Sequence, residues 1–347
     1  MKTVGRVILC VILLVLTGLM VALASFAPGF VFSFYTDFSR SCIEKIAAVT
    51  GALPFALWEV LAATVILSAL CLLILGRRFL RWLTGLAVTA SILIFAFVGL
   101  WGLNHFAPGI ETHLGLQVQP AAVSQLQEAA SYFAQQAAAL PVERDADGRL
   151  ANSMDIWLQE AGQGYEKLGE KYTFFDVPTL PVKTMLSSPI MSHLGFTGAF
   201  IPITAESTVN TQTYPASLPF TMCHELAHGM AAAKEQDANF CAFLGCIYHP
   251  DPDFQYSGWY SALIYTYNAL YATDRQAALE VMDALPAAIR TELQLAQAHY
   301  RPYEGTAQDT AQKINDTYLK AFKEKDGVES YSRAADLLTA WYLLQDN

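Results

Sequence analysis

The sequence carries little charge, and what it carries is mostly acidic. Only 15% of its 347 residues are Asp, Glu, Lys or Arg, whereas soluble domains usually have about 25%. The 21 Lys and Arg are outnumbered by 31 Asp and Glu, which gives a formal net charge of −10. A phosphate backbone is bound by a basic face, so we exclude nucleic acid as a partner.

The sequence also lacks a Cys-x-x-Cys pair. Its six cysteines include Cys223, Cys241 and Cys246, which surround the histidine motif described below. Their clustering raises the alternative of a cysteine-ligated metal or a disulfide. Buried free cysteine is the commoner state when the paired spacing is missing, and we expect that state here.

The chain is rich in apolar residues, which are concentrated in its N-terminal part. Hydrophobic residues make up 54% of the sequence. Residues 1–107 hold seven Lys and Arg and three Asp and Glu, so the remaining residues hold 14 basic and 28 acidic side chains. This contrast predicts an apolar, basic membrane anchor over 1–107 and an acidic globular domain over 108–347, which is long enough to bury a core.

Three apolar runs in the first part are long enough to cross a bilayer. They cover residues 7–27, 55–75 and 83–104. The N-terminus and the loop between the second and third runs carry most of the Lys and Arg, which places both in the cytoplasm. Three crossings then put the domain 108–347 outside the cytoplasm, and the protein is expected to be a multi-pass membrane protein whose partner is the lipid bilayer.

The chemistry of the chain is expected at His224-Glu225-Leu226-Ala227-His228, an HExxH pattern. Residues four apart on a helix lie about 40° apart around its axis, so His224 and His228 project from one face and can bind a single Zn²⁺. Glu225 can then act as general base toward a water that zinc activates. Ser217 and Pro219 indicate the start of this helix.

A third ligand requires the chain to turn after His228. On one unbroken helix Asp237 would lie about 140° from His224, and Gly229 offers a break. The run Ala231-Ala232-Ala233-Lys234 favours helix and argues against an early turn. A second helix beginning near Glu235 would place Glu235 as ligand and Asn239 as an amide that orients a ligand histidine. Asp237 remains the competing ligand.

Several segments resemble the bacterial membrane-protein family known as domain of unknown function 3810. The resemblance rests on the segment around HExxH, on Met191-Ser192-His193-Leu194-Gly195-Phe196-Thr197-Gly198 and on Tyr256-Ser257-Gly258-Trp259, together with further stretches near residue 101 and the C-terminus. It implies a membrane-bound metallopeptidase. The Glu-x-x-Ala-Asn that follows HExxH is similar to the second motif of gluzincin metallopeptidases, which implies Glu235 rather than Asp237. The family usually has Gly where this chain has Ala231.

The predicted fold class is mainly α (α+β): three transmembrane helices and a zincin-like, mostly helical domain with a small β element. Helices are expected over 121–139 and 152–171, and the best strand over Phe196–Thr204. That strand is either an edge strand that pairs with an extended substrate or a core strand. Glu206 and Asn210 could line the cleft, but they are expected to face solvent. Tyr331 or Arg333 would stabilise a developing oxyanion, although a structural role is favoured.

Three functions fit these residues. The first is a zinc peptidase in which His224, His228 and Glu235 bind the metal, Glu225 is the base and Asn239 supports the ligands. The second is a membrane-anchored binding or scaffold protein with a structural or degenerate zinc site. Glu225 argues against it, because a structural site needs no base. The third is a zinc hydrolase with a non-peptide substrate.

Overall fold

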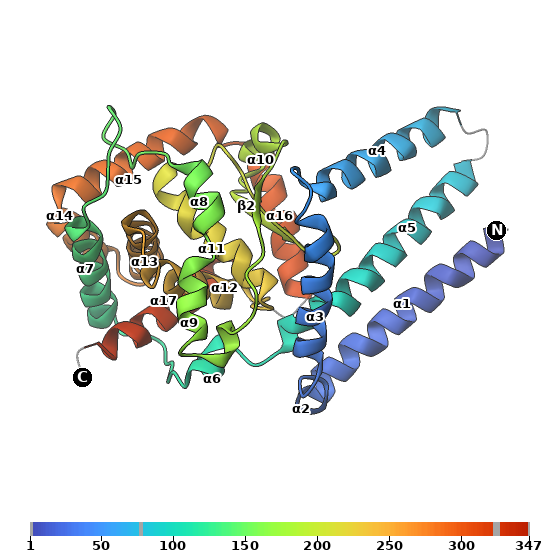
Figure 1. Ribbon diagram of the computed structural model, residues 1–347, viewed down its shortest axis with the longest axis horizontal. Helices are drawn as coiled ribbons and strands as arrows, with labels where there is room; N and C mark the ends of the chain where they lie inside the picture. The colour runs from blue at the N-terminus through green and yellow to red at the C-terminus, as the bar shows by residue number, and fades with distance from the viewer. Residues whose placement is uncertain (1–2, 76–78, 322–326, 346–347) are drawn as a thin grey trace. The chain divides into compact units, whose positions relative to one another are not determined.

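The computed structural model describes residues 3–75, 79–321 and 327–345, and the chain divides into two compact units (Figure 1). The first unit comprises Met1–Ala107 together with Ile201–Glu206. The second comprises Pro108–Phe200 and Ser207–Asn347.

Long apolar helices form the first unit. Helices α1 (Thr3–Phe26) and α5 (Phe79–Leu100) pack against each other. By length and composition, α1 and the stretch Arg81–Leu100 of α5 qualify as membrane spans. The sequence predicted three spans, and the structure supports two. Residues 55–75 do form a helix, α4 (Leu57–Leu75), but its apolar stretch among the described residues, Leu57–Cys71, is shorter than the other two.

Two shorter helices, α2 (Pro28–Val31) and α3 (Tyr35–Thr50), connect α1 to α4. Helix α3 is fixed to the end of α5 by side-chain hydrogen bonds. The Tyr35 hydroxyl donates to the Val98 carbonyl at 3.0 Å, and the Ser39 hydroxyl donates to the Leu100 carbonyl at 2.7 Å. These bonds satisfy carbonyls at the end of α5 that have no partner within the helix.

Glu206 caps the N-terminus of α4 within the first unit. Its carboxylate accepts hydrogen bonds from the backbone N–H groups of Leu57 at 2.8 Å and Trp58 at 2.9 Å. The negative charge is favourable at the positive end of the helix dipole. The expectation that Glu206 and Asn210 face solvent is therefore wrong. Both are 2% exposed, and the Asn210 amide donates to the Ser192 hydroxyl at 2.9 Å.

The second unit is mostly helical, as the composition predicted. Helix α7 (Val123–Ala139) matches the predicted helix over 121–139. The helix predicted over 152–171 is two helices, because Gly162 interrupts it where the backbone approaches the side chain of Thr179. The remaining helices of this unit are α6 (Ile110–Leu114), α8 (Met154–Glu160), α9 (Gln163–Gly169), α10 (Ser188–Leu194), α11 (Leu218–Gly229), α12 (Glu235–Ile247), α13 (Pro252–Thr273), α14 (Arg275–Ala284), α15 (Ala287–Tyr300), α16 (Thr306–Ala321) and α17 (Gly327–Leu343).

Three short strands form the described sheet, in the order β1-β3-β2. They are β1 (Val182–Thr184), β2 (Gly198–Ile201) and β3 (Glu206–Val209). Strands β1 and β3 are parallel, with Val182 opposite Ser207. The Asn210 N–H donates to the Thr197 carbonyl and the Thr208 hydroxyl to the Ala199 carbonyl, so β2 runs antiparallel to β3. The predicted strand over Phe196–Thr204 is thus shorter than expected, and it lies at an edge of the sheet.

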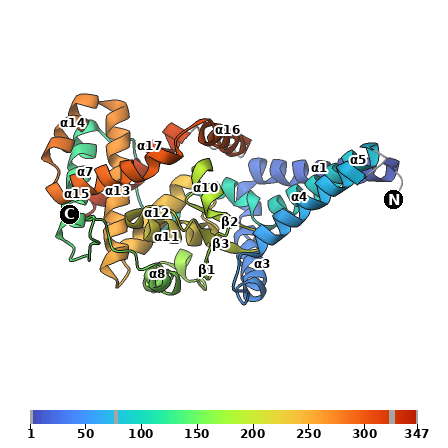
Figure 2. The ribbon, with the colours of Figure 1, turned by 90° about the horizontal axis from the view of Figure 1, so that it is seen from above.

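The core of the second unit surrounds α13, which packs against α7, α12 and α17 (Figure 1). Aromatic rings make the contact. The Phe133 ring stacks on Trp259 with centroids 5.9 Å apart, and the Phe243 ring meets Trp341 edge-on at 4.9 Å. Figure 2 shows the strands beside α11, where the Ser207 hydroxyl of β3 donates to the Glu225 carbonyl at 3.0 Å. The packed core thus fixes the helix that carries the HExxH residues.

Candidate metal centre

Helix α11 carries three of the predicted site residues. It begins with Pro219 in its first turn, as predicted, while Ser217 occupies the N-cap position without a side-chain capping bond. Its apolar side is fully buried: Met222 and Leu226 are both 0% exposed. The imidazoles of His224 and His228 lie together on its other face, with ring centroids 4.6 Å apart and planes at 88°.

The chain turns immediately after α11, as a third ligand from the following helix would require. Helix α11 ends at Gly229, and Ala231 has a left-handed backbone with φ +71°. The Ala232 N–H donates to the Ala227 carbonyl at 3.1 Å and the Ala231 N–H to the His228 carbonyl at 3.0 Å, which is the Schellman arrangement of a helix end. The alanine run therefore does not form a helix, because these bonds and the burial of the turn outweigh its local preference.

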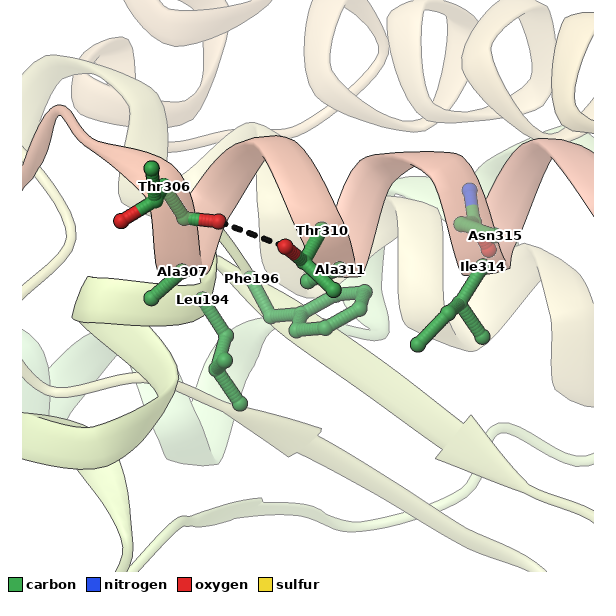
Figure 3. A pocket seen from close by; sticks show the side chains of 8 residues that line it. All are labelled: Leu194, Phe196, Thr306, Ala307, Thr310, Ala311, Ile314 and Asn315. Carbon is green, nitrogen blue, oxygen red and sulfur yellow. Dashed lines mark hydrogen bonds between the residues drawn. The ribbon is translucent and has the colours of Figure 1, made fainter.

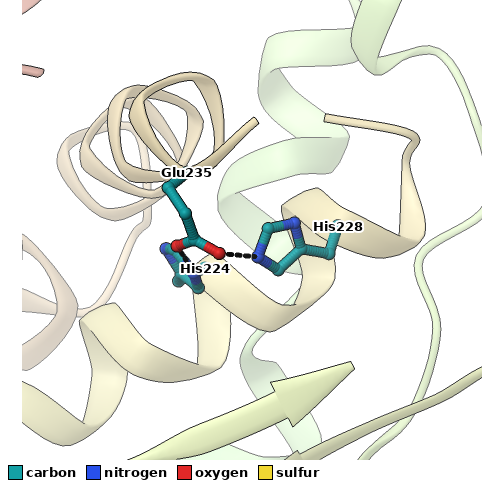
Figure 4. Close-up of side chains that lie close together, drawn as sticks. All are labelled: His224, His228 and Glu235. Carbon is teal, nitrogen blue, oxygen red and sulfur yellow. Dashed lines mark ion pairs between the residues drawn. The ribbon is translucent and has the colours of Figure 1, made fainter. Parts of the chain in front are cut away.

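This turn brings Glu235, the first residue of α12, back to the histidines (Figure 4). The Nε2 atom of His224 lies 3.4 Å from Glu235 Oε2, and Nε2 of His228 lies 3.7 Å from Oε1. One ligand atom from each of the three residues lies within 4.8 Å of the others. The structure thus brings together the three residues that the sequence predicted as ligands.

These donors suit a zinc ion. Two imidazole nitrogens and a carboxylate oxygen are a common ligand set of zinc hydrolases. Bonds of about 2.0–2.2 Å in a tetrahedral site place the ligand atoms about 3.3–3.6 Å from one another. The distance of 3.4 Å between His224 and Glu235 falls in this range, and the 3.7 Å between His228 and Glu235 is just above it.

Neighbouring groups orient both imidazoles. His228 Nδ1 lies 2.8 Å from the Ala232 carbonyl, which can only accept, so Nδ1 carries the proton and Nε2 is unprotonated on the side that faces Glu235. The Asn239 side chain forms a hydrogen bond with His224, and the Tyr265 hydroxyl donates to Asn239 Oδ1 at 2.8 Å. Asn239, for which the sequence predicted a supporting role, is thus in contact with His224.

The surroundings of His224 and Glu225 shift the pKa values of both side chains. Burial lowers the pKa of His224, but hydrogen bonds and charges from Glu235, Glu225 and Asn239 outweigh it, so the pKa lies above its usual value. Burial raises the pKa of Glu225 to about 8, with Glu235 also raising it while His224 and the Phe200 N–H lower it. A carboxyl group with a pKa near neutrality suits general acid–base chemistry.

Strand β2 borders Glu225, and the close fit of Gly198 against this residue was not predicted. A Cβ atom on Gly198 would stand 2.8 Å from Glu225 Cγ and 2.8 Å from Thr221 Cγ2, so a larger residue there would have to displace one of these side chains. The Phe200 N–H donates to the Glu225 carboxylate. Since Thr197 and Ala199 direct their carbonyls toward β3, the backbone groups of Gly198 and Phe200 point to the opposite, outer edge.

The other residues considered for the site are not part of the cluster formed by His224, His228 and Glu235. Asp237 is buried at 6% exposure, but it is two residues beyond Glu235 on α12 and therefore lies about 200° around the helix from it. Arg333 is on α17, is exposed and acts electrostatically on Asp336; the side chain of Tyr331 lies outside the described part of the chain. Cys223, Cys241 and Cys246 are free and 0% exposed, as predicted.

Comparisons with known proteins place the chain in a family but give it no function. No curated protein and no solved structure matches it. The model of the family described as "Protein of unknown function (DUF3810)" matches residues 34–339. Because this match covers well over half of the chain, the protein belongs to that family.

Proposed function

We propose that the protein is a membrane-anchored, zinc-dependent peptidase. The observation that carries the proposal is the convergence of His224, His228 and Glu235, whose ligand atoms lie within 4.8 Å of one another. The neighbouring Glu225 is 5% exposed and is the group that distinguishes a hydrolytic site from a structural one. Zinc held by these donors would lower the pKa of a water molecule and polarise a carbonyl group.

The protein residues have separate tasks in this proposal. Glu225 accepts the proton of the attacking water and returns it to the leaving amine. The Ala232 carbonyl and the Asn239 amide hold the two imidazoles in position, which maintains the ligand geometry.

The outer edge of β2 favours a peptide substrate. The backbone groups of Gly198 and Phe200 point away from β3, and the Phe200 N–H already donates to Glu225. An extended peptide pairing with this edge would therefore run past the catalytic carboxylate. The missing side chain at Gly198 lets the Glu225 carboxylate lie directly against this strand.

We also propose that α4 crosses the membrane as a third span, with the N-terminus in the cytoplasm and the metal centre outside it. Helix α4 has 19 residues, about 28 Å of helix, and its exposed side chains include Ile66, Leu67 and Ile74, which are 59%, 61% and 78% exposed. Such a surface needs a lipid environment. Accessibility of a cysteine introduced on the surface of the second unit to a membrane-impermeant thiol reagent tests the orientation, in a background where Cys10, Cys42 and Cys71, the three cysteines that are not buried, are replaced by serine.

The zinc content of the purified protein tests the metal site. We expect one zinc per chain in the wild type and its loss in Glu235→Gln. Asp237→Asn is the matched control, because it makes the same amide substitution two residues away and should keep the metal. A wild type that takes up no zinc on reconstitution would contradict the proposal and favour a scaffold role.

Hydrolysis of a randomised peptide library tests the base. Glu225→Gln should retain zinc and lose activity by about 10²–10⁴-fold, the usual contribution of general acid–base catalysis. Hydrolysis that survives this substitution would rule out the assigned role of Glu225. Zinc uptake without cleavage of any peptide, combined with cleavage of another amide or ester class, would make the protein a hydrolase with a different substrate.

A further inference from the structure

A pocket of about 670 Å³ lies between the end of α10, the start of β2 and one face of α16 (Figure 3). This volume is in the range of about 300–1,000 Å³ that is typical of small-molecule sites. None of its lining residues is charged; they are Leu194, Phe196, Thr306, Ala307, Thr310, Ala311, Ile314 and Asn315.

The lining is suited to an apolar group. Phe196, Leu194 and Ile314 present ring and aliphatic surface, as Figure 3 shows. The Thr310 hydroxyl is engaged, since it donates to the Thr306 carbonyl of its own helix at 2.7 Å. A charged ligand would find no partner of opposite sign among the lining residues, whereas an apolar one would gain the free energy of leaving water.

Phe196, which lines the pocket, is close in sequence to the residue of β2 that contacts Glu225. Phe196 precedes Gly198 by two residues, a separation of at most about 7 Å along the chain. Gly198 in turn lies against Glu225. A residue that lines the pocket and the residue that contacts Glu225 therefore lie on the same short stretch of chain, Phe196–Gly198.

Hydrogen bonds and close packing hold the pocket residues near α10 and β2 in place. The Phe196 N–H donates to the Met191 carbonyl at 3.0 Å, and its carbonyl accepts from the Asn210 amide at 2.9 Å. Gly195 ends α10 with φ +78°, and the side chain of Gln308 from α16 packs closely on it. The relation of α16 to the start of β2 is thus set by direct packing.

We propose that this pocket binds a large apolar side chain of the peptide substrate and so sets the sequence preference of the enzyme. This inference rests on the proposed peptidase function, because the substrate must lie along β2. It predicts that cleavage sites share Leu, Ile, Met or Phe at one fixed position relative to the scissile bond.

Filling the mouth of the pocket tests the proposal. Ala307 lines the pocket and is exposed, so Ala307→Phe should occlude it without disturbing the core. For substrates with Leu at the preferred position we expect kcat/KM to fall at least about 10-fold, mainly through KM, because differences in apolar side-chain binding of this kind are worth about 10–200-fold. Substrates with Gly there should be unaffected.

Gln312→Phe is the matched control, since Gln312 is also exposed on α16 but does not line the pocket. It should behave as the wild type. An Ala307→Phe enzyme whose preference between Leu and Gly substrates is unchanged would overturn the inference while leaving the peptidase function intact.

Binding to a non-hydrolysing protein separates the two proposals. In a Glu225→Gln background, fluorescence anisotropy of a labelled peptide with Leu should give tighter binding than the Gly peptide, and Ala307→Phe should remove the difference. If the difference is lost and the wild type cleaves nothing, the pocket stands and the peptidase function fails. If Leu and Gly peptides bind equally, the pocket inference fails, whatever the hydrolysis shows.

Discussion

Gly198 of β2 lies directly against Glu225 of α11, so that a single methyl group on the strand would stand 2.8 Å from Glu225 Cγ. The carboxylate of Glu225 and the edge strand are therefore in close contact. Glycine is favoured at position 198 because of this close contact and not because of the local backbone conformation.

We expect Gly198→Ala to lower peptide hydrolysis at least about 10-fold while zinc is retained, because the methyl group displaces Glu225 but touches none of the three proposed ligands. Overpacking of this kind also lowers the free energy of unfolding by about 1–3 kcal/mol. Activity, zinc content and denaturant unfolding of the purified protein would be measured together.

Gly29→Ala is the control for this prediction, since a Cβ atom on Gly29 would meet nothing within 4 Å. It should leave activity unchanged. A Gly198→Ala protein that is fully active would show that Glu225 has room to move and that the close fit has no part in catalysis.

Ala231 provides a second prediction, at the turn that returns the chain to Glu235. Its φ of +71° costs an alanine roughly 1–2 kcal/mol, whereas glycine adopts this region freely. We expect Ala231→Gly to raise the free energy of unfolding by up to about 1 kcal/mol and to keep both zinc and activity. Chemical denaturation in detergent would measure the change.

Ala232→Gly is the matched comparison in the same turn. Ala232 is not among the residues with positive φ, so glycine gains no relief there and should lower stability by about 0.5–1 kcal/mol. Equal effects of the two substitutions would mean that the left-handed conformation at Ala231 carries no strain.

The turn after α11 shows which features of the candidate site could be predicted from the sequence and which could not. The histidine spacing and Glu235 follow from helix geometry and the HExxH pattern, and the supporting role of Asn239 follows from its place four residues after Glu235. The turn itself contradicts the helix preference of three consecutive alanines, because bonds to Ala227 and His228 come from tertiary folding rather than from local propensity. The opposition of Gly198 and Glu225 joins segments 27 residues apart, which no short-range pattern encodes.

The membrane part shows another limit of the sequence. Apolar run lengths predicted three similar spans, but the described part of α4 is shorter than the other two. Its first turn is capped by Glu206, some 150 residues away in the chain. A charged residue that was expected in solvent thus serves as a buried cap, because the backbone N–H groups of a helix end need an acceptor.

A third prediction concerns the buried carboxylate of Glu292, which is 0% exposed. It pairs with Arg144 and accepts hydrogen bonds from the hydroxyls of Tyr214 at 2.6 Å and Tyr256 at 2.9 Å. Tyr256→Phe removes a donor from a buried charge, and we expect the free energy of unfolding to fall by about 1.5–3 kcal/mol.

Tyr260→Phe is an unusually close control for Tyr256→Phe. The two rings are stacked, with centroids 6.0 Å apart and planes at 7°, but the buried Tyr260 hydroxyl has no hydrogen-bond partner in the described structure. Its removal should be neutral or slightly stabilising. Equal losses from both variants would show that the hydroxyls contribute through packing rather than through the bond to Glu292.

The last prediction concerns His249, which is 1% exposed and stacked on Phe254 with centroids 3.8 Å apart. Its Nε2 lies 2.9 Å from the Glu160 carbonyl, and its Nδ1 accepts from the Asp251 N–H at 3.0 Å. Both ring nitrogens are thus satisfied by the neutral imidazole. Protonation would place a hydrogen on Nδ1 opposite another donor.

Burial lowers the pKa of His249, and nearby Lys167 acts in the same direction, against the raising effects of the Glu160 carbonyl and the Asp251 and Glu160 charges. The unfolded chain therefore binds a proton at a higher pH than the folded protein does. The stabilisation is fully present above the ordinary histidine pKa of about 6.5 and is lost as the pH falls below it, with a slope of at most about 1.4 kcal/mol per pH unit.

Denaturant unfolding of the zinc-loaded protein between pH 5 and pH 8 would measure this dependence. His249→Gln should be less stable than the wild type at pH 8, and the difference should shrink as the pH is lowered, because only the wild type must then keep an imidazole neutral in the core. His193→Gln, at an exposed position, should retain the wild-type slope. A stability difference between wild type and His249→Gln that stays constant over this range would mean that His249 is protonated equally in the folded and unfolded states, despite the two bonds that require its neutral form.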